Sequence, residues 1–364
     1  MTEEFIFCDE LGPEKIIEIY DPKSTLKAVL VVDNVALGPS VGGIRMAPDV
    51  TVEECARLAR AMTLKNAAAD LPHGGGKSVI LADPAMSVRD KERIIRSFAR
   101  AIEDIKDYIP GPDMGTNEAA MAWIRDEIGR AAGLPKESGG IPLDEIGATG
   151  FGIAIALEVA QDFSDLRLEG ARIAIQGFGA VGQHGARFLS DRGAILVAAS
   201  DSRGCIHNPA GIDVEKLIDF KAGGNSVAEF TDGERLDGDA LLDVQCEVWI
   251  PAARPDVLTE ENVHRLTAKV VAEGANIPAT AAAEEMLADR GILVLPDFIA
   301  NAGGVICAAV ELSNGDEAQA MKTIESKTRH NMREVLESAA AEKLLPRDAA
   351  VKMARARVLN AMSH

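Results

Sequence analysis

Two lysines and one aspartate occupy positions where a charged side chain needs a partner or a function. Lys65 follows Met62 at i+3 on a predicted helix whose apolar residues recur from Val52, so its side chain lies on a buried face. Lys77 follows three glycines and begins an apolar segment, and Asp113 lies in a Pro- and Gly-rich turn before a predicted helix. A buried ammonium must meet an anion or extend to solvent. Taken singly, each residue fits a solvated lysine or a helix N-cap, so a functional prediction rests on all three together.

The three side chains together suit an oxidation at an α-carbon. Such a reaction needs a cation for a carboxylate, a group that polarises the developing carbonyl and a group that carries protons. Two neighbouring ammonium groups in a partly dry cleft lower one another's pKa. One lysine can then take part in proton transfer near neutral pH. We therefore expect an enzyme site at Lys65, Lys77 and Asp113.

A glycine-rich turn at residues 177–182 supplies a second kind of site. The sequence GFGAVG follows a predicted strand at 171–176 and opens a predicted helix, which is the context that a dinucleotide-binding fold requires. Its glycines permit a tight turn, close approach of the backbone to a pyrophosphate and packing of the helix on the strand. Amide groups at the start of that helix would face the phosphates. The expected cofactor-binding residues are Gly177, Gly179, Ala180, Val181 and Gly182.

An acidic residue ends the next predicted strand. Asp201 lies about 20 residues beyond the glycine turn, where an acid accepts hydrogen bonds from the adenosine ribose and repels a 2′-phosphate. This favours NAD over NADP. Arg203, two residues further on, would instead hold that phosphate, so NADP stays open as an alternative.

The elements that must position these residues divide the chain in two. Strands are predicted at 27–34 and 77–83, with helices that begin near Val52, at 88–105 and at 116–132. A Gly- and Pro-rich stretch at 133–147 precedes an alternation of strands and helices, which indicates a parallel sheet covered on both faces. We expect an α/β protein with a substrate-binding and oligomerisation domain at 1–135, a doubly wound Rossmann domain at 136–334 and a C-terminal helix at 335–364 that folds back on the first domain.

Composition sets the class of protein and of partner. The 364 residues are 47% apolar and 26% charged, as in globular proteins of two domains. A net charge of -19 argues against nucleic acid and anionic membranes as partners. Five scattered cysteines without a CxxC pair indicate a reducing compartment and no zinc site, and no metal is expected. Without a signal peptide or an apolar run of roughly 20 residues, we expect a cytoplasmic protein.

The chain also resembles a known family. The segment MTLKNAAADLPHGGGKSVILADP (62–84) is similar to the signature of the glutamate/leucine/phenylalanine/valine dehydrogenases. Counterparts follow in order over nearly the whole chain: ALGPSVGGIRMAP (36–48), PDMGTNE (112–118), GATGFG (147–152), IQGFGAVG (175–182), SDSRG (200–204), EGANIP (273–278) and PDFIANAGGV (296–305).

The resemblance implies roles for single residues. Lys65 would bind the substrate α-carboxylate, Lys77 would polarise the carbonyl and activate water, and Asp113 would act as general acid and base. Thr149, Asn276 and Asn301 would contact the nicotinamide end of the cofactor. The family fold implies a cleft between the two domains and a homo-oligomer, as a dimer, hexamer or octamer.

The residues predicted to line the pocket for the substrate side chain indicate the class of substrate. Glutamate enzymes of the family carry a lysine in the segment GP-aromatic-K-GG, and Val41 occupies that position here. A distal carboxylate against Val41 would be an unpaired buried charge, which costs several kcal/mol. By position the apolar pocket comprises Leu37, Gly38, Val41, Met62, Gly111, Val305 and Ala308.

We therefore expect NAD-dependent oxidative deamination of an apolar L-amino acid to its 2-oxo acid and ammonium, and the reverse reaction. The pocket is closest to those of leucine, branched-chain or phenylalanine dehydrogenases. Two alternatives stay open: a glutamate dehydrogenase, and a catalytically silent NAD-binding regulatory protein. The intact set of Lys65, Lys77 and Asp113 argues against the silent protein.

Overall fold

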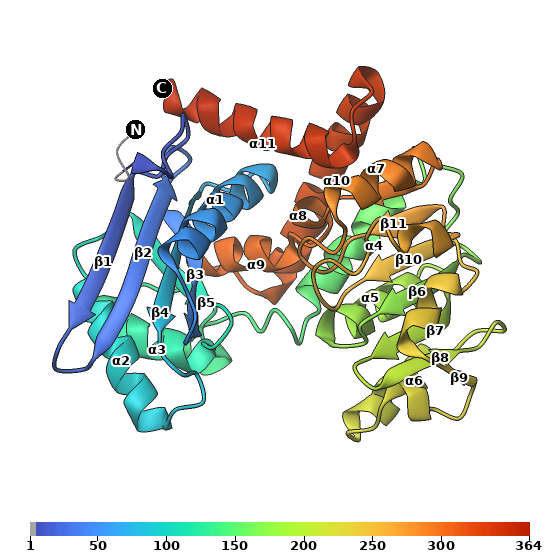
Figure 1. The fold of residues 1–364 in the computed structure, drawn as a ribbon, viewed down its shortest axis with the longest axis horizontal. Coiled ribbons are helices and arrows are strands. Elements are labelled where there is room, and N and C mark those ends of the chain that lie inside the picture. The colour runs from blue at the N-terminus through green and yellow to red at the C-terminus, as the bar shows by residue number, and fades with distance from the viewer. Residues whose placement is uncertain (1–4) are drawn as a thin grey trace. The chain divides into compact units, whose positions relative to one another are not determined.

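The computed structural model describes residues 5–364 and contains two compact units (Figure 1). The first comprises residues 1–142, 305–320 and 351–364, and the second comprises 143–304 and 321–350. Each unit is an α/β layer structure, which confirms the predicted fold class. Among the described residues, no helix combines the length and apolarity needed to cross a membrane.

Unit 1 is built on a five-stranded sheet with the order β1-β2-β4-β3-β5. β1 pairs with β2 and β2 with β4 in antiparallel fashion, whereas β3 is parallel to both β4 and β5. The strands are β1 (Lys15–Asp21), β2 (Leu26–Asn34), β3 (Ser40–Ala47), β4 (Gly74–Leu81) and β5 (Tyr108–Pro112). Its helices are α1 (Val52–Ala68), α2 (Val88–Ala101) and α3 (Glu118–Ile128), with most of α9 (Gly303–Leu312) and α11 (Pro346–Met362).

The two faces of this sheet are covered differently. On one face, branched apolar side chains of β2, β3 and β4 pack against α2 and α3, where Phe98 and Met121 are fully buried. On the other, Val31 and Val79 pack against small residues of α1, including Cys55 and Ala59. Because successive residues of a strand point to opposite faces, this second face also receives every other residue of β3, β4 and β5. Helix α1 therefore lies directly over the positions where Lys77 and its neighbours project.

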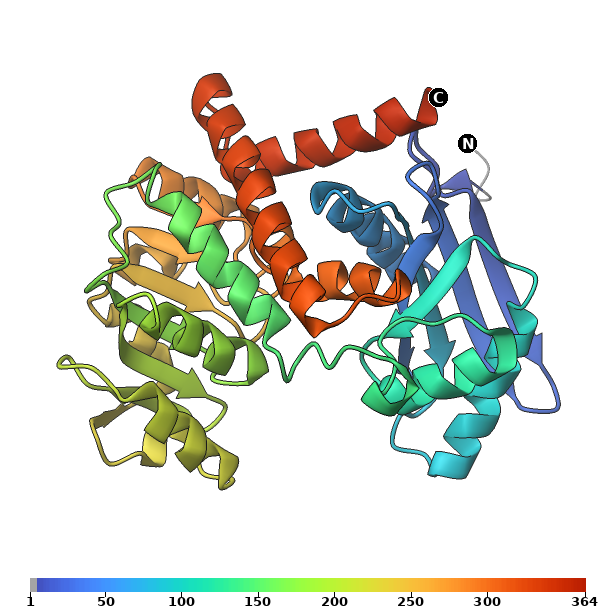
Figure 2. The same ribbon diagram turned by 180° about the vertical axis from the view of Figure 1, so that it is seen from behind.

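Unit 2 contains a seven-stranded sheet with the order β12-β11-β10-β6-β7-β8-β9. The strands are β6 (Arg172–Gln176), β7 (Ile195–Asp201), β8 (Gly204–His207), β9 (Glu234–Leu236), β10 (Val248–Pro251), β11 (Val270–Ala272) and β12 (Leu293–Leu295). The helices are α4 (Ala148–Ala160), α5 (Ala180–Ser190), α6 (Val214–Ala222), α7 (Ala281–Asp289), α8 (Asp297–Ala300) and most of α10 (Glu317–Glu342). Helices α4 and α5 lie side by side along the sheet (Figure 2).

Only part of this second sheet is parallel. The five strands from β12 to β7 are parallel, as the alternation of strands and helices predicts. β8 and β9 are antiparallel additions at one edge, because the chain reverses tightly after β7 and pairs Asp201 with Gly204. Gly204 has φ +147°, a backbone conformation that only glycine adopts readily.

Candidate active site

Lys77 and Asp113 meet in unit 1. The Lys77 ammonium lies 2.7 Å from a carboxylate oxygen of Asp113, and only 6% of Lys77 is exposed. Lys77 projects from the middle of β4, and Asp113 directly follows β5. The sequence placed these residues 36 positions apart, and the parallel strands β4, β3 and β5 bring them together. Such a buried pair of an ammonium and a carboxylate can exchange protons with a molecule bound beside it.

Two glycines make room for this pair. A Cβ atom on Gly43 would lie 2.7 Å from the Cβ of Asp113 and 3.2 Å from the Lys77 nitrogen. A Cβ on Gly75 would lie 2.0 Å from the backbone nitrogen of Thr63 on α1. Side chains at either position would therefore displace the site residues or the helix that covers them. Gly43 was not predicted as a site residue, although the GG pair in residues 42–43 is the sequence signal for a close approach.

Helix α1 is fixed over the site by a buried polar cluster. Asp33 on β2 is 1% exposed and accepts hydrogen bonds from the Thr63 hydroxyl (2.6 Å) and the Arg60 guanidinium (2.9 Å). The Asn66 amide donates to the Gly74 carbonyl at 2.7 Å. Lys65 lies between these anchors in the last turn of α1 and is half-buried. The anchors set the rotation and height of the helix that carries Lys65.

Arg45 is a second cation at Asp113 that sequence reasoning missed. Its Nε donates to Asp113 at 3.1 Å, while its terminal nitrogen pairs with Glu54 of α1 at 2.5 Å. Burial acts to raise the pKa of Asp113, but the charges and hydrogen bonds of Lys77 and Arg45 outweigh it, so the pKa lies below its ordinary value. Asp113 is therefore held ionised between two cations. Cys55, which lies beneath Lys77 and bonds its carbonyl, is no rival nucleophile because burial raises its pKa to about 12.

Removal of Arg45 should shift the pH dependence of catalysis. The folded-state pKa of Asp113 is depressed, so losing one of its cations raises it. In Arg45→Met, the acidic limb of the kcat/KM–pH profile should move to higher pH, and Arg45→Lys should recover part of the shift. Arg93→Met, which changes an exposed arginine paired with Asp90 at 3.3 Å, is the control. An acidic limb at the wild-type position in Arg45→Met would show that Arg45 does not position or tune Asp113.

The predicted side-chain pocket residues all belong to unit 1. Val41 is 9% exposed and shares a strand face with Gly43 and Arg45. A Cβ on Gly111 would meet only the Ala132 carbonyl, at 3.9 Å, so space lies open there. The remaining pocket residues are half-buried: Leu37, Gly38, Met62, Val305 and Ala308. The part of the pocket on β3 and β5 thus adjoins the Lys77–Asp113 pair, while the others lie on a loop, α1 and α9.

Glu311 anchors helix α9, which carries Val305 and Ala308. Its carboxylate is 8% exposed and accepts three backbone N–H bonds, from Gly133 (2.8 Å), Leu134 (3.2 Å) and Ile141 (2.9 Å). A carboxylate that accepts several backbone N–H groups forms strong charge-assisted bonds. This fixes α9 against the Gly- and Pro-rich stretch that precedes unit 2 in the chain.

The glycine turn of unit 2 has the features that a dinucleotide needs. Gly177 has φ +92°, and a Cβ on Gly182 would lie 2.1 Å from the Gly177 carbonyl oxygen. Gly179 is the N-cap of α5 with no side-chain cap, and nothing lies within 4 Å of its added Cβ. The first amides of α5 are therefore open to a ligand, with Ala180 exposed and Val181 half-buried beside them. Thr149 lies in the first turn of α4.

Asn276 and Asn301 are in contact. The Asn301 amide donates to the Asn276 side-chain oxygen at 3.0 Å. Asp297, at the start of α8, accepts from the backbone of Ile277 (2.8 Å) and so holds the loop that carries Asn276. Beneath this loop, Arg347 pairs with three buried carboxylates: Glu273 (2.7 Å), Glu284 (2.5 Å) and Asp297 (2.9 Å).

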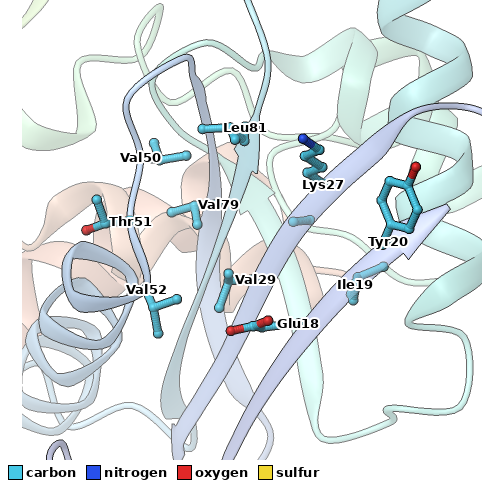
Figure 3. Close-up of a pocket in the computed structure, with 11 residues that line it drawn as sticks. Glu18, Ile19, Tyr20, Lys27, Val29, Val50, Thr51, Val52, Val79 and Leu81 are labelled. Carbon is cyan, nitrogen blue, oxygen red and sulfur yellow. The ribbon is translucent and has the colours of Figure 1, made fainter. Parts of the chain in front are cut away.

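A groove on the outer surface of unit 1 lies apart from these residues. It is open, about 550 Å³ in volume, and Figure 3 shows Tyr20 and Lys27 at one end and Val50, Thr51 and Val52 at the other. None of Lys65, Lys77 and Asp113 lines it. We therefore assign no catalytic role to this groove.

Comparison with known proteins gives consistent matches. Residues 139–364 match the family described as Glutamate/Leucine/Phenylalanine/Valine dehydrogenase, and residues 13–130 match the dimerisation domain of the Glu/Leu/Phe/Val dehydrogenases. A glutamate dehydrogenase of Aeropyrum pernix is 39% identical over 90% of this chain and 84% of its own length. An NAD-specific glutamate dehydrogenase of Staphylococcus aureus is 38% identical over 84% of this chain and 76% of its own.

Solved structures agree. The glutamate dehydrogenase of Peptoniphilus asaccharolyticus has a TM-score of 0.86 and 30% identity over 98% of this chain and 94% of that chain. The L-tryptophan dehydrogenase of Nostoc punctiforme has a TM-score of 0.77 and 25% identity over 97% of this chain and 98% of that chain. The matched proteins thus include one named for an aromatic amino acid.

Proposed function

Because the chain belongs to the glutamate/leucine/phenylalanine/valine dehydrogenase family, we propose that Lys65, Lys77 and Asp113 catalyse the interconversion of an L-amino acid and its 2-oxo acid, with glutamate as the first candidate substrate. The protein is an NAD-dependent amino acid dehydrogenase. The observation that carries the assignment of residues is the buried 2.7 Å pair of Lys77 and Asp113.

Each residue has a chemical task in this proposal. The Lys65 ammonium binds the α-carboxylate of the amino acid. Asp113, ionised between Lys77 and Arg45, accepts a proton from the substrate amino group. The Lys77 ammonium stabilises negative charge on the oxygen of the attacking water, whose first proton passes to solvent. Lys77 then gives a proton to the amino nitrogen and takes one from the hydroxyl group as the 2-oxo acid forms, and the released ammonia takes up the proton held by Asp113. Ammonium then leaves, and the reverse sequence aminates the 2-oxo acid.

The residues of unit 2 fit the cofactor. A bound nicotinamide cofactor would supply the acceptor for the hydride of the α-carbon. The open amides of α5 and the glycines before them would hold the pyrophosphate, since a side chain at Gly179 would occupy that space. Thr149 and the Asn276–Asn301 pair would hold the nicotinamide end.

An apolar amino acid is the second candidate substrate. The sequence favours an apolar amino acid as the substrate. The relatives named glutamate dehydrogenase favour glutamate, which was the alternative left open by the sequence. The specific observation in support of an apolar substrate is Val41, apolar and 9% exposed where the glutamate enzymes place a lysine. A carboxylate against this residue would lack a counter-ion from β3.

A substrate panel separates the two candidates. Reduced cofactor should be consumed with ammonium and one of 2-oxoglutarate, the branched-chain 2-oxo acids or phenylpyruvate. Preference for 2-oxoglutarate supports the first candidate, and preference for an apolar 2-oxo acid supports the second. No turnover with any member of the panel would contradict the dehydrogenase proposal and favour a silent NAD-binding protein.

Val41→Lys tests the pocket itself. An ammonium at this position would pair with a distal carboxylate, so the ratio of kcat/KM for glutamate to that for leucine should rise at least tenfold, about 1.4 kcal/mol. Val50→Lys, a change in the groove of Figure 3, is the control and should leave the ratio unchanged. An unchanged ratio in Val41→Lys would remove Val41 from the substrate pocket.

We further propose that the protein is a homo-oligomer. The match of residues 13–130 to a dimerisation domain supports this. Its size, whether dimer, hexamer or octamer, is measurable by light scattering on the purified full chain.

A further inference from the structure

We propose that Asp297 is a positioning residue for the nicotinamide end of the cofactor, because it holds Ile277 in a left-handed backbone conformation and so fixes two asparagines before the cofactor binds. These asparagines are Asn276 and Asn301, which the proposed function assigns to the cofactor, and the inference rests on that function. All four residues belong to unit 2.

The segments that carry these residues follow parallel strands. The loop 273–278 follows β11, and α8 follows β12. The glycine turn follows β6, and the loop 252–258 follows β10 of the same parallel set. Because the carboxyl ends of parallel strands lie at one edge of the sheet, all four segments lie at the edge where a dinucleotide binds. A Cβ on Gly177 would lie 2.7 Å from the Cβ of Ala253, so the loop after β10 lies against the glycine turn.

Ile277 has an unfavourable backbone conformation. Its φ is +48°, in a region that β-branched residues rarely adopt. The residue is 57% exposed, so packing of its side chain contributes little to this conformation. Instead, its N–H donates to the Asp297 carboxylate at 2.8 Å, and its carbonyl accepts from the backbone N–H of Asp256 at 3.0 Å. Strain of this kind persists only where the surrounding structure fixes it, and it is concentrated at functional sites.

Asp297 is bonded to the segments of both asparagines. Its side chain bonds the residue after Asn276, and its backbone carbonyl accepts from the Asn301 backbone N–H at 2.6 Å. The Asn301 amide donates in turn to the Asn276 side-chain oxygen at 3.0 Å and to the Gly274 carbonyl at 3.3 Å. These bonds form a closed ring that begins and ends at Asp297. The ring fixes the two asparagines relative to each other and leaves Asn276 exposed.

The Asp297 carboxylate is itself held in place. Asp297 is 4% exposed, and its backbone N–H donates to the buried carboxylate of Glu273 at 3.0 Å. Its second carboxylate oxygen lies 2.9 Å from the Arg347 guanidinium. Groups that are ordered before a ligand arrives lose less entropy when it binds. The bond from Ile277 to Asp297 should therefore raise the affinity for the cofactor.

Direct binding tests this without turnover. NADH is titrated into the full-length protein, and the dissociation constant is read from nicotinamide fluorescence. In Asp297→Ala the constant should rise at least tenfold, whereas Asp297→Asn, which keeps an oxygen for the Ile277 N–H, should stay within threefold of wild type. Adding Ile277→Gly to Asp297→Ala should recover at least threefold of the loss, because glycine adopts a positive φ without strain.

A matched control separates positioning from a general loss of stability. Glu284→Ala removes another carboxylate that pairs with Arg347, at 2.5 Å, but this one lies on α7 and not beside the loop. It should lower the unfolding temperature about as much as Asp297→Ala does, and it should leave the dissociation constant for NADH within twofold of wild type. Equal weakening of NADH binding in the two alanine variants, or no recovery with Ile277→Gly, overturns the proposal.

A measurement on the wild type keeps the test decisive if a variant does not fold. Amide hydrogen exchange is followed by mass spectrometry of overlapping peptides that cover 273–278, before NADH is added. The Ile277 amide should exchange at least tenfold more slowly than in an unstructured chain, although the residue is 57% exposed. Exchange at the unstructured rate would show that Asp297 does not hold the loop, and this too overturns the proposal.

The outcome is distinct from that of the proposed function. A protein that binds NADH with the expected changes in the variants, but turns over no 2-oxo acid, would overturn the dehydrogenase function and leave the role of Asp297 intact. A protein that turns over 2-oxo acids and binds NADH equally well with and without the Asp297 carboxylate would do the opposite.

Discussion

Lys77→Met should reduce kcat by about 10³-fold while leaving NADH affinity within about twofold of wild type. The lysine lies in unit 1, 6% exposed and 2.7 Å from Asp113, whereas the glycine turn for the cofactor lies in unit 2. Methionine fills similar volume, and Asp113 retains Arg45 as a partner, so the fold should persist. Steady-state rates and nicotinamide fluorescence measure the two quantities.

A second variant distinguishes charge from proton transfer. Lys77→Arg keeps a cation beside Asp113, yet arginine does not release its proton in proteins. If Lys77 acts in proton transfer, this variant should bind substrate and remain nearly inactive. Lys91→Met, a lysine of α2 that bonds the Pro84 carbonyl at 3.3 Å, should behave as wild type. Turnover of Lys77→Met within tenfold of wild type would rule out the proposed role.

Arg347→Met should lower the free energy of unfolding by about 3–5 kcal/mol, the range for breaking a buried ion pair. Within the described part of the chain, Arg347 is the cation that pairs with Glu273, Glu284 and Asp297, each of which is at most 4% exposed. Without it, three buried carboxylates would face one another. Urea unfolding monitored by circular dichroism measures the loss.

The loss of stability in Arg347→Met should depend on pH. Burial raises the pKa of Glu273 and of Glu284, and the attraction of Arg347 offsets part of the effect. Removing Arg347 raises both further, so the protonated acids are favoured in the folded state. The variant should therefore lose stability as the pH rises above the ordinary glutamate pKa of about 4.3 and regain part of it as the pH falls.

An exposed arginine is the matched control. Arg333→Met breaks a surface pair with Asp162 and should cost less than about 1 kcal/mol. Equal losses in the two variants, or a loss in Arg347→Met that does not depend on pH, would show that the buried cluster does not stabilise unit 2.

The sequence predicts the elements whose patterns are local. The strands β2, β6 and β7, the helices α1 and α2, and the glycine turn before α5 were expected close to where they lie. These segments have strong apolar periodicity or a motif bounded by both of its elements. The family resemblance then joined Lys77 to Asp113, and the structure places them in contact.

The missed features depend on contacts between distant segments. β3 contains a GG pair and gave no strand signal, so Arg45 was not expected beside Asp113. Asp201 lies where the fingerprint predicts it, but Lys221 and Ser226, which occupy its oxygens, follow 20 and 25 residues later. Likewise, no local pattern indicates that residues 305–320 belong to unit 1, because the bonds that tie them there, such as those of Glu311, reach residues far away in the sequence.

Unit 1 is assembled from three separate segments of the chain, and this limits which fragments of the protein can fold. A fragment that stops at Pro142 would carry Lys65, Lys77 and Asp113, yet it would lack Glu311 and Arg357, whose guanidinium caps the last carbonyls of α1. An excised first half would thus have every reactive group and none of the braces supplied from beyond residue 300. A minimal version would have to splice 305–320 and 351–364 back in with designed connectors.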